Sequence, residues 1–243
     1  MDRPYITLIL PAYNESATIR RTITRTVDYF QLRQYRYEII AAIDGDDGAR
    51  ELVAEMSKTN PAIKVTGHSG RCGKGRGIRE AIRISTGAVI GYADADYKVP
   101  IEEFDKIQPL LVQGYDVVIG SRGLAKSVVE RKQPLYRRLG SRGFAVFMRA
   151  VVGLAGISDT QCGFKFFTRA AALRLFAAQK IDGYMFDVEI LSIAQLLGYR
   201  IAETPIRWQD DGDSRLQLFR GNLRNVIDIF RIRRMRPQYK ESC

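Results

Sequence analysis

Short apolar segments alternate with amphipathic segments through the first half of the chain, and this alternation constrains the fold more than any other feature. The apolar segments are rich in β-branched residues and end in Gly, Asp or Pro, as strands often do. We expect strands over residues 5–10, 37–43, 63–66, 88–93 and 116–120, and helices over residues 16–30, 48–57, 74–85 and 101–111. Alternation of this kind predicts an α/β fold with a mainly parallel sheet flanked by helices.

The second half of the chain has a different pattern, in which helical segments dominate. We expect a basic loop at 121–133, helices at 134–152, 169–178 and 186–197, a polar turn at 158–163, a strand at 200–207 and a last helix over about 215–232 that ends before Pro237. No internal repeat or linker separates these elements from the first half. The sequence therefore predicts one domain, residues 1–243, with a first half at 1–121 and a second half at 122–243.

The two halves differ in charge. The chain has 38 basic and 27 acidic residues, a net charge of +11, and the first half carries 16 of each sign. The second half carries 22 basic and 11 acidic residues, and the excess is concentrated in residues 122–149 and 215–240, with eight basic residues and one acidic residue in each. Such segments indicate an anionic partner, which can be a nucleic acid, a membrane surface or a phosphate-bearing substrate.

The composition excludes several kinds of site. His68 is the single histidine, which excludes catalysis by paired histidines, and the three cysteines have no C-x-x-C spacing, which argues against a disulfide scaffold or structural zinc. We expect His68 and Cys162 to be structural. The N-terminus shows no signal-peptide pattern, and the longest apolar run, residues 144–157, is interrupted by Arg149. We expect a cytoplasmic protein that does not cross a membrane.

Polar and glycine-rich motifs follow the expected strands. They are P-A-Y-N-E (residues 11–15), I-D-G-D-D-G (43–48), G-R-C-G-K-G-R-G (70–77), D-A-D (94–96) and G-S-R (120–122). In parallel sheets ligands bind beyond the carboxyl ends of the strands, so these motifs are expected to meet at one edge. Taken singly, each has a simpler explanation: Asn14 or Ser16 can cap a helix, and a capped turn accounts for one of the three aspartates after the second strand.

Two carboxylates leave the fourth expected strand close together. Asp94 and Asp96 repel each other unless a cation joins them, and oxygen ligands of this kind suit Mg²⁺ or Mn²⁺ with a substrate phosphate. The glycines and cations of residues 70–77 open a helix and form a plausible anion cradle, although the segment lacks the ending of a P-loop. The first half therefore predicts a site for a metal ion and a diphosphate.

In order and spacing these motifs resemble the family 2 glycosyltransferases of GT-A fold, over nearly the whole chain. In the second half, D-T-Q-C-G-F-K (159–165), F-D-V-E-I-L (186–191), E-T-P-I-R-W (203–208) and G-D-S-R (212–215) are similar to the polyprenyl-phosphate sugar synthases, and most of all to those that make dolichyl-phosphate glucose. The resemblance implies a metal-dependent hexosyltransferase that uses a nucleotide-diphospho-sugar.

The resemblance also implies which residues bind the donor. They are Pro11, Ala12, Tyr13, Glu15, Asp44, Lys74, Asp94, Ala95, Asp96 and Arg215. Asp96, together with Asp94, would ligate Mg²⁺ or Mn²⁺, whose charge stabilises the leaving nucleoside diphosphate. The sequence departs from the family at Ile43, where relatives usually have the first acidic residue of D-D-G-S, so one acidic contact to the nucleoside is in question.

Cationic side chains are expected on the acceptor side. A phosphate acceptor has to approach a second polyanion, so we expect Arg122 and Arg138, with Ser141, to hold its phosphate, because a guanidinium matches phosphate geometry. A phosphate oxygen is already ionised and needs no strong base. If the acceptor were a hydroxyl, Asp159 or Asp187 could serve as the base, whereas the structural alternative makes them a turn cap and a helix cap. We therefore expect the catalytic residues to be Asp96, Arg122, Arg138 and Asp159.

The expected activity is inverting transfer of a hexose from a nucleotide-sugar to a polyprenyl or dolichyl phosphate. UDP-glucose is the favoured donor and GDP-mannose is possible. The basic C-terminal helix and the 134–152 helix both carry apolar residues between arginines, so they are candidates for peripheral contact with an anionic membrane at its cytoplasmic face. Two alternatives remain: the same donor chemistry on a soluble acceptor, and a non-enzymatic nucleic-acid binder, against which stands the absence of a recognised binding motif.

Overall fold

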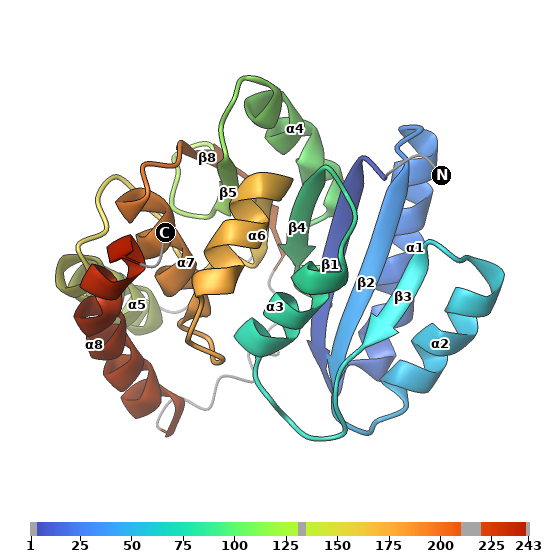
Figure 1. Ribbon diagram of the computed structural model, residues 1–243, viewed down its shortest axis with the longest axis horizontal. Helices are drawn as coiled ribbons and strands as arrows, with labels where there is room; N and C mark the ends of the chain where they lie inside the picture. The colour runs from blue at the N-terminus through green and yellow to red at the C-terminus, as the bar shows by residue number, and fades with distance from the viewer. Residues whose placement is uncertain (1–3, 131–134, 210–219, 242–243) are drawn as a thin grey trace.

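The computed structural model describes residues 4–130, 135–209 and 220–241, without the side chains of residues 135–142, 220–222 and 240–241. Its centre is a seven-stranded sheet in the order β3-β2-β1-β4-β7-β5-β8, and β7 alone runs antiparallel to its neighbours. The strands are β1 (Ile6–Tyr13), β2 (Tyr37–Asp44), β3 (Ile63–Thr66), β4 (Val89–Ala93), β5 (Val117–Ser121), β7 (Phe164–Thr168) and β8 (Ile201–Pro205). The expected α/β fold with a mainly parallel sheet is confirmed (Figure 1).

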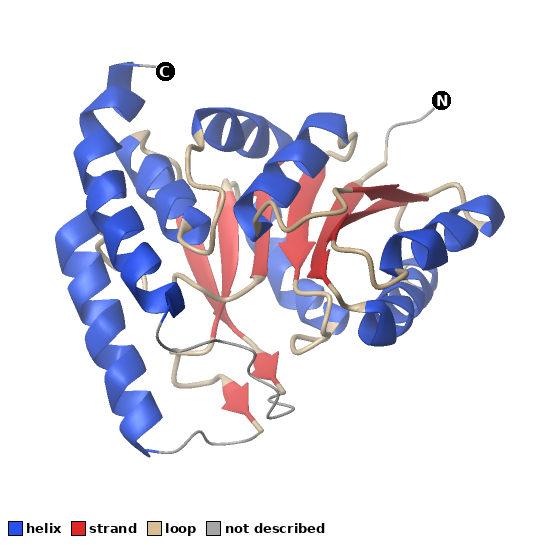
Figure 2. Ribbon diagram, turned by 90° about the horizontal axis from the view of Figure 1, so that it is seen from below, coloured by secondary structure: helices blue, strands red, loops and turns tan. Residues whose placement is uncertain are grey.

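Helices cover both faces of this sheet, as Figures 1 and 2 show. They are α1 (Ser16–Leu32), α2 (Ala49–Thr59), α3 (Lys74–Ile84), α4 (Phe104–Val112), α5 (Leu135–Val152), α6 (Arg169–Ala178), α7 (Phe186–Leu196) and α8 (Arg220–Glu241). A 3₁₀ turn, η1 (Ile101–Glu103), precedes α4, and two short strands, β6 (Val128–Val129) and β9 (Arg207–Trp208), form a separate parallel pair.

Successive side chains of each strand point to opposite faces, and this divides the core in two. Ile9 and Ile40 pack in one cluster with α3, α6 and α7, whereas Leu8 and Ile39 pack in the other with α1, α2 and α4. Because both faces are covered, the parallel strands contain near-continuous apolar residues. Burial on both faces explains why these strands could be found from the sequence.

The structure differs from the expected elements in three places. The residues after the turn at 158–163 form β7, because the charge of Lys165 inside it is matched by Asp187 at 2.5 Å and so did not prevent a buried strand. The first strand continues through Pro11 to Tyr13. Since β4 pairs with β1 only as far as Ile9, one edge of β1 is open beyond that point and tolerates a residue that has no N–H.

The third correction concerns the last helix. It was expected to end before Pro237, yet α8 continues through it to Glu241. A proline inside a helix removes one backbone hydrogen bond, but the next turn is held by Tyr239, which is buried and donates its hydroxyl proton to Glu189. Tertiary packing therefore outweighs the local preference. The expected start of this helix at residue 215 lies outside the described residues.

Candidate active site at the carboxyl edge of the sheet

The motifs that follow the strands meet at one edge of the sheet, as expected from its topology. Tyr13 and Asp44 are direct partners in the β1–β2 register, and β4 ends beside them, where the strand order reverses. The antiparallel β7 begins at this same edge, where the backbone N–H of Asp94 donates to the carbonyl of Gly163 at 3.1 Å. Residues from both halves of the chain therefore contribute to one site.

The β1 end of the site is aromatic and open. The ring of Tyr13 is 41% exposed, and the guanidinium of Arg71 lies 4.8 Å from its centroid. Arg71 also donates a hydrogen bond to the hydroxyl of Tyr184, at 3.3 Å, which comes from the loop between α6 and α7. Pro11 and Ala12 lie in β1 itself, half-buried, and Glu15 precedes α1 and accepts a hydrogen bond from Thr18 at 3.1 Å.

The aspartates after β2 have separate roles. Asp44 is buried, and its Oδ2 accepts the backbone N–H groups of Cys72 at 2.7 Å and Gly73 at 3.3 Å, which fixes the loop that enters α3. Asp47 accepts the backbone N–H of Ser16 at 2.8 Å and that of Ala49 at 3.2 Å. Asp47 is therefore the capping residue of this motif, and neither Asn14 nor Ser16 is the N-cap of α1, which begins after Glu15.

Ile43 marks the departure from the family pattern noted in the sequence. Its side chain is fully buried and belongs to the core cluster on the α1–α2 face. A side chain buried in this way does not reach a ligand at the edge of the sheet. Asp44, the next residue, instead contacts the loop at residues 72 and 73 that enters α3.

The D-A-D segment is held from several sides. Asp94 forms an ion pair with Lys74 at 2.6 Å, and Asp96 forms one with Lys98 at 3.0 Å, so each carboxylate has its own ammonium group. Between them, the carbonyl of Ala95 accepts a hydrogen bond from Thr22 of α1 at 2.7 Å. The side chains of Asp94 and Asp96 are 41% and 28% exposed. Two accessible carboxylates at this edge fit the oxygen chemistry of Mg²⁺ or Mn²⁺.

Lys74 is the cation closest to this segment. Burial works against its positive charge, but Asp94 and Asp187 outweigh that effect and raise the pKa of the ammonium group above its ordinary value. Lys74 is the first residue of α3, so its charge lies at the end of the helix that favours anions. The expected anion cradle of residues 70–77 therefore contains a permanently charged lysine, and in this structure Lys74 is paired with Asp94.

Residue 163 has to be a glycine because it lies against the side chain of Asp94. A Cβ atom at this position would lie 2.2 Å from Oδ2 of Asp94 and 2.4 Å from its Cγ. The carboxylate therefore occupies the space that any side chain at residue 163 would take. The heptapeptide at 159–165 is the most specific motif of the sequence, and its Gly163 leaves the space that Asp94 of the first half occupies.

Behind this contact lies a buried polar network that the sequence did not reveal. Lys165 is fully buried, and its ammonium group donates to Asp187 at 2.5 Å and to the carbonyl of Cys162 at 2.5 Å. Tyr92 of β4 also donates to Asp187. Asp187 is therefore neither a helix N-cap, since the N-cap residue of α7 is Met185, nor open to a substrate, and it serves as the counter-ion of Lys165.

Arg122 and Asp159, both expected on the acceptor side, form an ion pair. The guanidinium of Arg122 contacts both carboxylate oxygens of Asp159, at 2.7 and 2.9 Å, and lies 5.7 Å from the ring centroid of Trp208. Desolvation opposes the charge of Asp159, but Arg122 outweighs it and lowers the pKa of Asp159 to about 2. Glu203 accepts the backbone N–H groups of Ser158 and Asp159 at 2.7 and 3.0 Å, which anchors this loop to β8.

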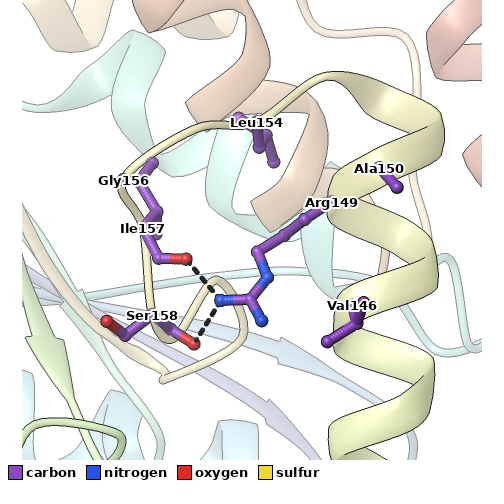
Figure 3. A pocket seen from close by; sticks show the side chains of 7 residues that line it. All are labelled: Val146, Arg149, Ala150, Leu154, Gly156, Ile157 and Ser158. Carbon is purple, nitrogen blue, oxygen red and sulfur yellow. Dashed lines mark hydrogen bonds between the residues drawn. The ribbon is translucent and has the colours of Figure 1, made fainter.

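A pocket of about 430 Å³ opens next to this loop, between α5 and residues 153–158. Figure 3 shows Arg149 extending from α5 to the backbone carbonyls of Ile157 and Ser158, which it contacts at 2.9 and 3.5 Å. The other lining residues are Val146, Ala150, Leu154, Gly156, Ile157 and Ser158, so apolar side chains share the wall with polar groups. The pocket is therefore a mixed polar and apolar hollow beside the loop that leads to Asp159.

Three of the expected site residues fall where the structure does not describe them. Arg138 and Ser141 belong to α5, but their side chains are outside the described part, and Arg215 lies in the range 210–219. Their expected roles at the donor and the acceptor phosphate stay predictions. The motif G-D-S-R at 212–215 lies in the same range.

The two long basic helices lie side by side at one end of the molecule (Figures 1 and 2). Leu223, Ile227 and Phe230 of α8 are 68%, 57% and 52% exposed, and Val146 and Phe147 of α5 are exposed as well. The rings of Phe147 and Phe230 are in contact, with centroids 6.1 Å apart. Along α8, Leu223 and Ile227 are exposed, whereas Ile229 and Ile232 are buried in the core.

We call Leu223, Ile227 and Phe230 of α8, together with Val146 and Phe147 of α5, the apolar stripe. Arginines flank it. Arg224, Arg231, Arg233 and Arg234 of α8 are all exposed. In the parts of the chain that the structure describes, no helix is long and apolar enough to cross a bilayer. An exposed apolar surface bordered by positive charge is typical of interaction sites.

Comparison with known proteins finds a family model and relatives that match most of the chain. The family model described as glycosyl transferase family 2 matches residues 7–176. A dolichyl-phosphate beta-glucosyltransferase of Trichomonas vaginalis is 33% identical over 94% of this chain and 70% of its own length. A dolichyl-phosphate beta-glucosyltransferase of Dictyostelium discoideum is 32% identical over 96% of this chain and 75% of its own.

Solved structures agree in fold. Glucosyl-3-phosphoglycerate synthase from Mycobacterium tuberculosis, in complex with UDP, superposes with a TM-score of 0.66 at 20% identity, over 95% of this chain and 80% of that protein. A complex of the same synthase with Mn²⁺, UDP and phosphoglyceric acid superposes with a TM-score of 0.59 at 20% identity, over 84% and 69% of the two chains. At this level of identity the likeness supports the fold, which is the GT-A fold expected from the sequence.

Proposed function

Since the chain belongs to glycosyl transferase family 2, we propose that this glycosyltransferase moves a hexose from a nucleotide-diphospho-sugar to a polyprenyl or dolichyl phosphate, with inversion at the anomeric carbon. The donor that we favour is UDP-glucose, with GDP-mannose as the second choice. Two relatives that match most of the chain are dolichyl-phosphate beta-glucosyltransferases, which supports both the acceptor and the sugar.

The observation that carries the proposal is the state of Asp159. Its carboxylate is clamped by Arg122 and its pKa is lowered to about 2, so it accepts a proton very poorly at neutral pH. The other candidate base, Asp187, is buried against Lys165. A hydroxyl acceptor needs a base to remove its proton, whereas a phosphate brings an ionised oxygen. The acceptor side therefore favours a phosphate.

The donor is proposed to bind to the first half of the chain, residues 1–121, which has no net charge and is called the neutral half. Asp44, Tyr13 and Glu15, with Pro11 and Ala12, line the part of the edge proposed for the nucleoside, and Lys74 provides positive charge for the diphosphate. Asp94 and Asp96 would hold Mg²⁺ or Mn²⁺, which supplies charge to the leaving diphosphate; the neighbouring synthase has been solved with Mn²⁺ and UDP, in agreement with this chemistry.

On the acceptor side, Arg122 and Arg138 hold the attacking phosphate against the donor. One phosphate oxygen forms the new bond to the anomeric carbon as the bond to the nucleoside diphosphate breaks, and the electron pair leaves with the diphosphate. No proton has to be transferred. A single displacement converts an α-linked donor into a β-linked product.

The apolar stripe suits the hydrocarbon part of such an acceptor. The pocket of Figure 3 lies beside it on α5 and places Val146, Leu154 and Ile157 next to the charged Arg149. The stripe and its arginines would rest on an anionic membrane, where each basic residue near the surface contributes about 1 kcal/mol. We therefore propose peripheral contact with the membrane through α5 and α8.

The test of the proposal is a matrix of donors and acceptors. UDP-glucose, GDP-mannose and UDP-N-acetylglucosamine are each offered with Mg²⁺ or Mn²⁺ and with either a short polyprenyl phosphate or 3-phosphoglycerate. A glucosyl-lipid as the main product supports the proposal. Transfer to 3-phosphoglycerate alone would establish the soluble-acceptor alternative instead, which the dolichyl-phosphate relatives do not favour.

Arg138 separates the acceptor side from the donor side in the same assay. Its guanidinium is proposed to bind the acceptor phosphate, so Arg138→Ala should raise the KM for polyprenyl phosphate by about 10- to 150-fold, in line with the loss of one charged hydrogen bond of about 1.5–3 kcal/mol. UDP affinity, measured by calorimetry, should stay within twofold. Equal losses for both ligands would contradict the assignment.

A further inference from the structure

A second group of metal-ligating side chains lies at the same edge but apart from Asp94 and Asp96. Asp44, His68 and Cys72 each offer one ligand atom, and these atoms lie within 4.8 Å of one another. Within the described residues, this is the one cluster of three or more such side chains. Asp44 is buried, whereas His68 and Cys72 are partly exposed, so an ion from solvent can reach the group.

The backbone holds the three residues together. The N–H of Cys72 donates to Asp44 at 2.7 Å, and the N–H of Gly45 donates to the carbonyl of His68 at 2.9 Å. Gly67 allows this approach, because it has a φ of +134° and a Cβ atom there would lie 1.9 Å from the carbonyl oxygen of Ile43. The backbone therefore places the three side chains near one another before any ion binds.

Glu80 orients His68. Its carboxylate lies 2.8 Å from Nε2 of His68 and also accepts a hydrogen bond from Arg76 at 2.8 Å. With Nε2 directed at this carboxylate, Nδ1 is the ring nitrogen left to bind an ion. A carboxylate that orients a histidine in this way is common around bound zinc.

The donor set selects the ion. Sulfur, nitrogen and oxygen together suit Zn²⁺, whereas Mg²⁺ prefers oxygen alone. Ligand atoms of a tetrahedral zinc site are roughly 3.4–3.8 Å apart, as bond lengths of about 2.0–2.3 Å require. The ligand atoms of Asp44, His68 and Cys72 lie up to 4.8 Å apart, which is more than this range. Rotation of the Cys72 side chain can shorten the separation, since its thiol makes only a weak contact of 3.6 Å with the carbonyl of Gly70.

We propose that Asp44, His68 and Cys72 bind a zinc ion at the nucleoside end of the site, with the fourth position left to water. This replaces the structural role expected for His68. Because the proposed function assigns Asp44 to the donor nucleoside, zinc and UDP should exclude each other; that consequence rests on the proposed function, whereas zinc binding itself does not.

The experiment uses the full chain with Cys243→Ser as background, freed of metal by a chelator and kept reduced. Co²⁺, a spectroscopic substitute for zinc, should bind at one equivalent and give the thiolate-to-cobalt charge-transfer absorption in the near ultraviolet. Cys72→Ser should abolish that absorption, and Glu80→Gln should weaken binding about 10- to 100-fold. Zn²⁺ should displace the Co²⁺. A chain without the absorption, or one in which Cys72→Ser retains it, would overturn the proposal.

The second measurement is UDP affinity with and without one equivalent of Zn²⁺. Zinc should weaken UDP binding at least 10-fold in the background chain and leave it unchanged in Cys72→Ser. If cobalt binds through Cys72 but zinc does not affect UDP, the metal site stands and the assignment of Asp44 to the nucleoside is wrong. The two proposals therefore fail separately.

Discussion

The two halves of the chain differ in how they balance their charges. In the first half, Asp94 pairs with Lys74, Asp96 with Lys98 and the buried Glu38 with Lys64, so these three carboxylates have partners from the same half, whereas Glu103 also pairs with Arg207 of the second half. In the second half, arginines of α8 such as Arg224 and Arg231 lie exposed beside the apolar stripe. The neutral half thus forms an internally balanced site, and the basic half presents its excess charge outward. This difference supports our proposal that the basic half contacts an extended anionic surface in addition to a single phosphate.

Asp96→Ala tests whether the neutral half does the chemistry. Loss of this proposed metal ligand should lower the rate of transfer by about 10³-fold or more, comparable with the removal of a key transition-state donor, while the fold is retained. The rate is measured at saturating donor, and the fold by circular dichroism. Asp28→Ala, on the exposed side of α1, is the matched control. Turnover like that of the wild type would remove Asp96 from the metal site.

Gly163→Ala tests whether the halves are independent. The new methyl group would meet the carboxylate of Asp94 at 2.2 Å, so Asp94 must rotate away and transfer should fall about 10²-fold, as expected when a reacting group is displaced by about 1 Å. The control is Gly143→Ala in α5, where a Cβ atom meets nothing within 4 Å. Equal activities of the two variants would show that the second half does not position Asp94.

Asp159→Asn tests the ion pair between Arg122 and Asp159 of the second half through the pH dependence of the free energy of unfolding. The pKa of Asp159 is lowered from 3.8 to about 2, so its stabilising contribution is complete above pH 4 and is lost as the pH falls towards 2. The shift corresponds to roughly 2 kcal/mol in the free energy of unfolding. Urea denaturation should show the variant less stable by this amount at pH 7, with a gap that narrows below pH 4. A gap independent of pH would contradict the ion pair with Arg122.

Phe230→Ser should have the smallest effect, limited to the surface. The side chain is half exposed, so stability should change little, while binding to vesicles of anionic phospholipid should weaken about three- to tenfold, as expected for the loss of up to about 1.5 kcal/mol of apolar contact. Leu32→Ser is the control, since Leu32 is an exposed apolar residue of the neutral half. If both variants lose vesicle binding equally, the apolar stripe has no special role. Co-sedimentation measures the binding.

The sequence predicted the parts of the fold whose pattern is local. Strands β1, β2, β4 and β5 are largely apolar and buried, and their polar endings identified the edge where Asp44 and Asp94 now lie. The strand β7 could not be found, because its Lys165 looks exposed until Asp187, 22 residues later, is placed beside it. Arg122 and Asp159 were recognised from the sequence as separate candidates. Their pairing, and with it the low pKa of Asp159, depends on tertiary contact and could not be predicted.

The position of β7 also has a consequence for how the chain assembles. This strand lies between β4 and β5, with Val89 paired to Thr168 and Val117 to Phe167, so the central sheet closes only when a segment far along the chain is inserted. Pairings between residues so distant in sequence form slowly. Until then the inner edges of β4 and β5 have unsatisfied backbone groups and invite pairing with other chains. Cutting the chain near residue 121 would therefore yield two aggregating fragments, and the catalytic edge would be among the last regions to fold.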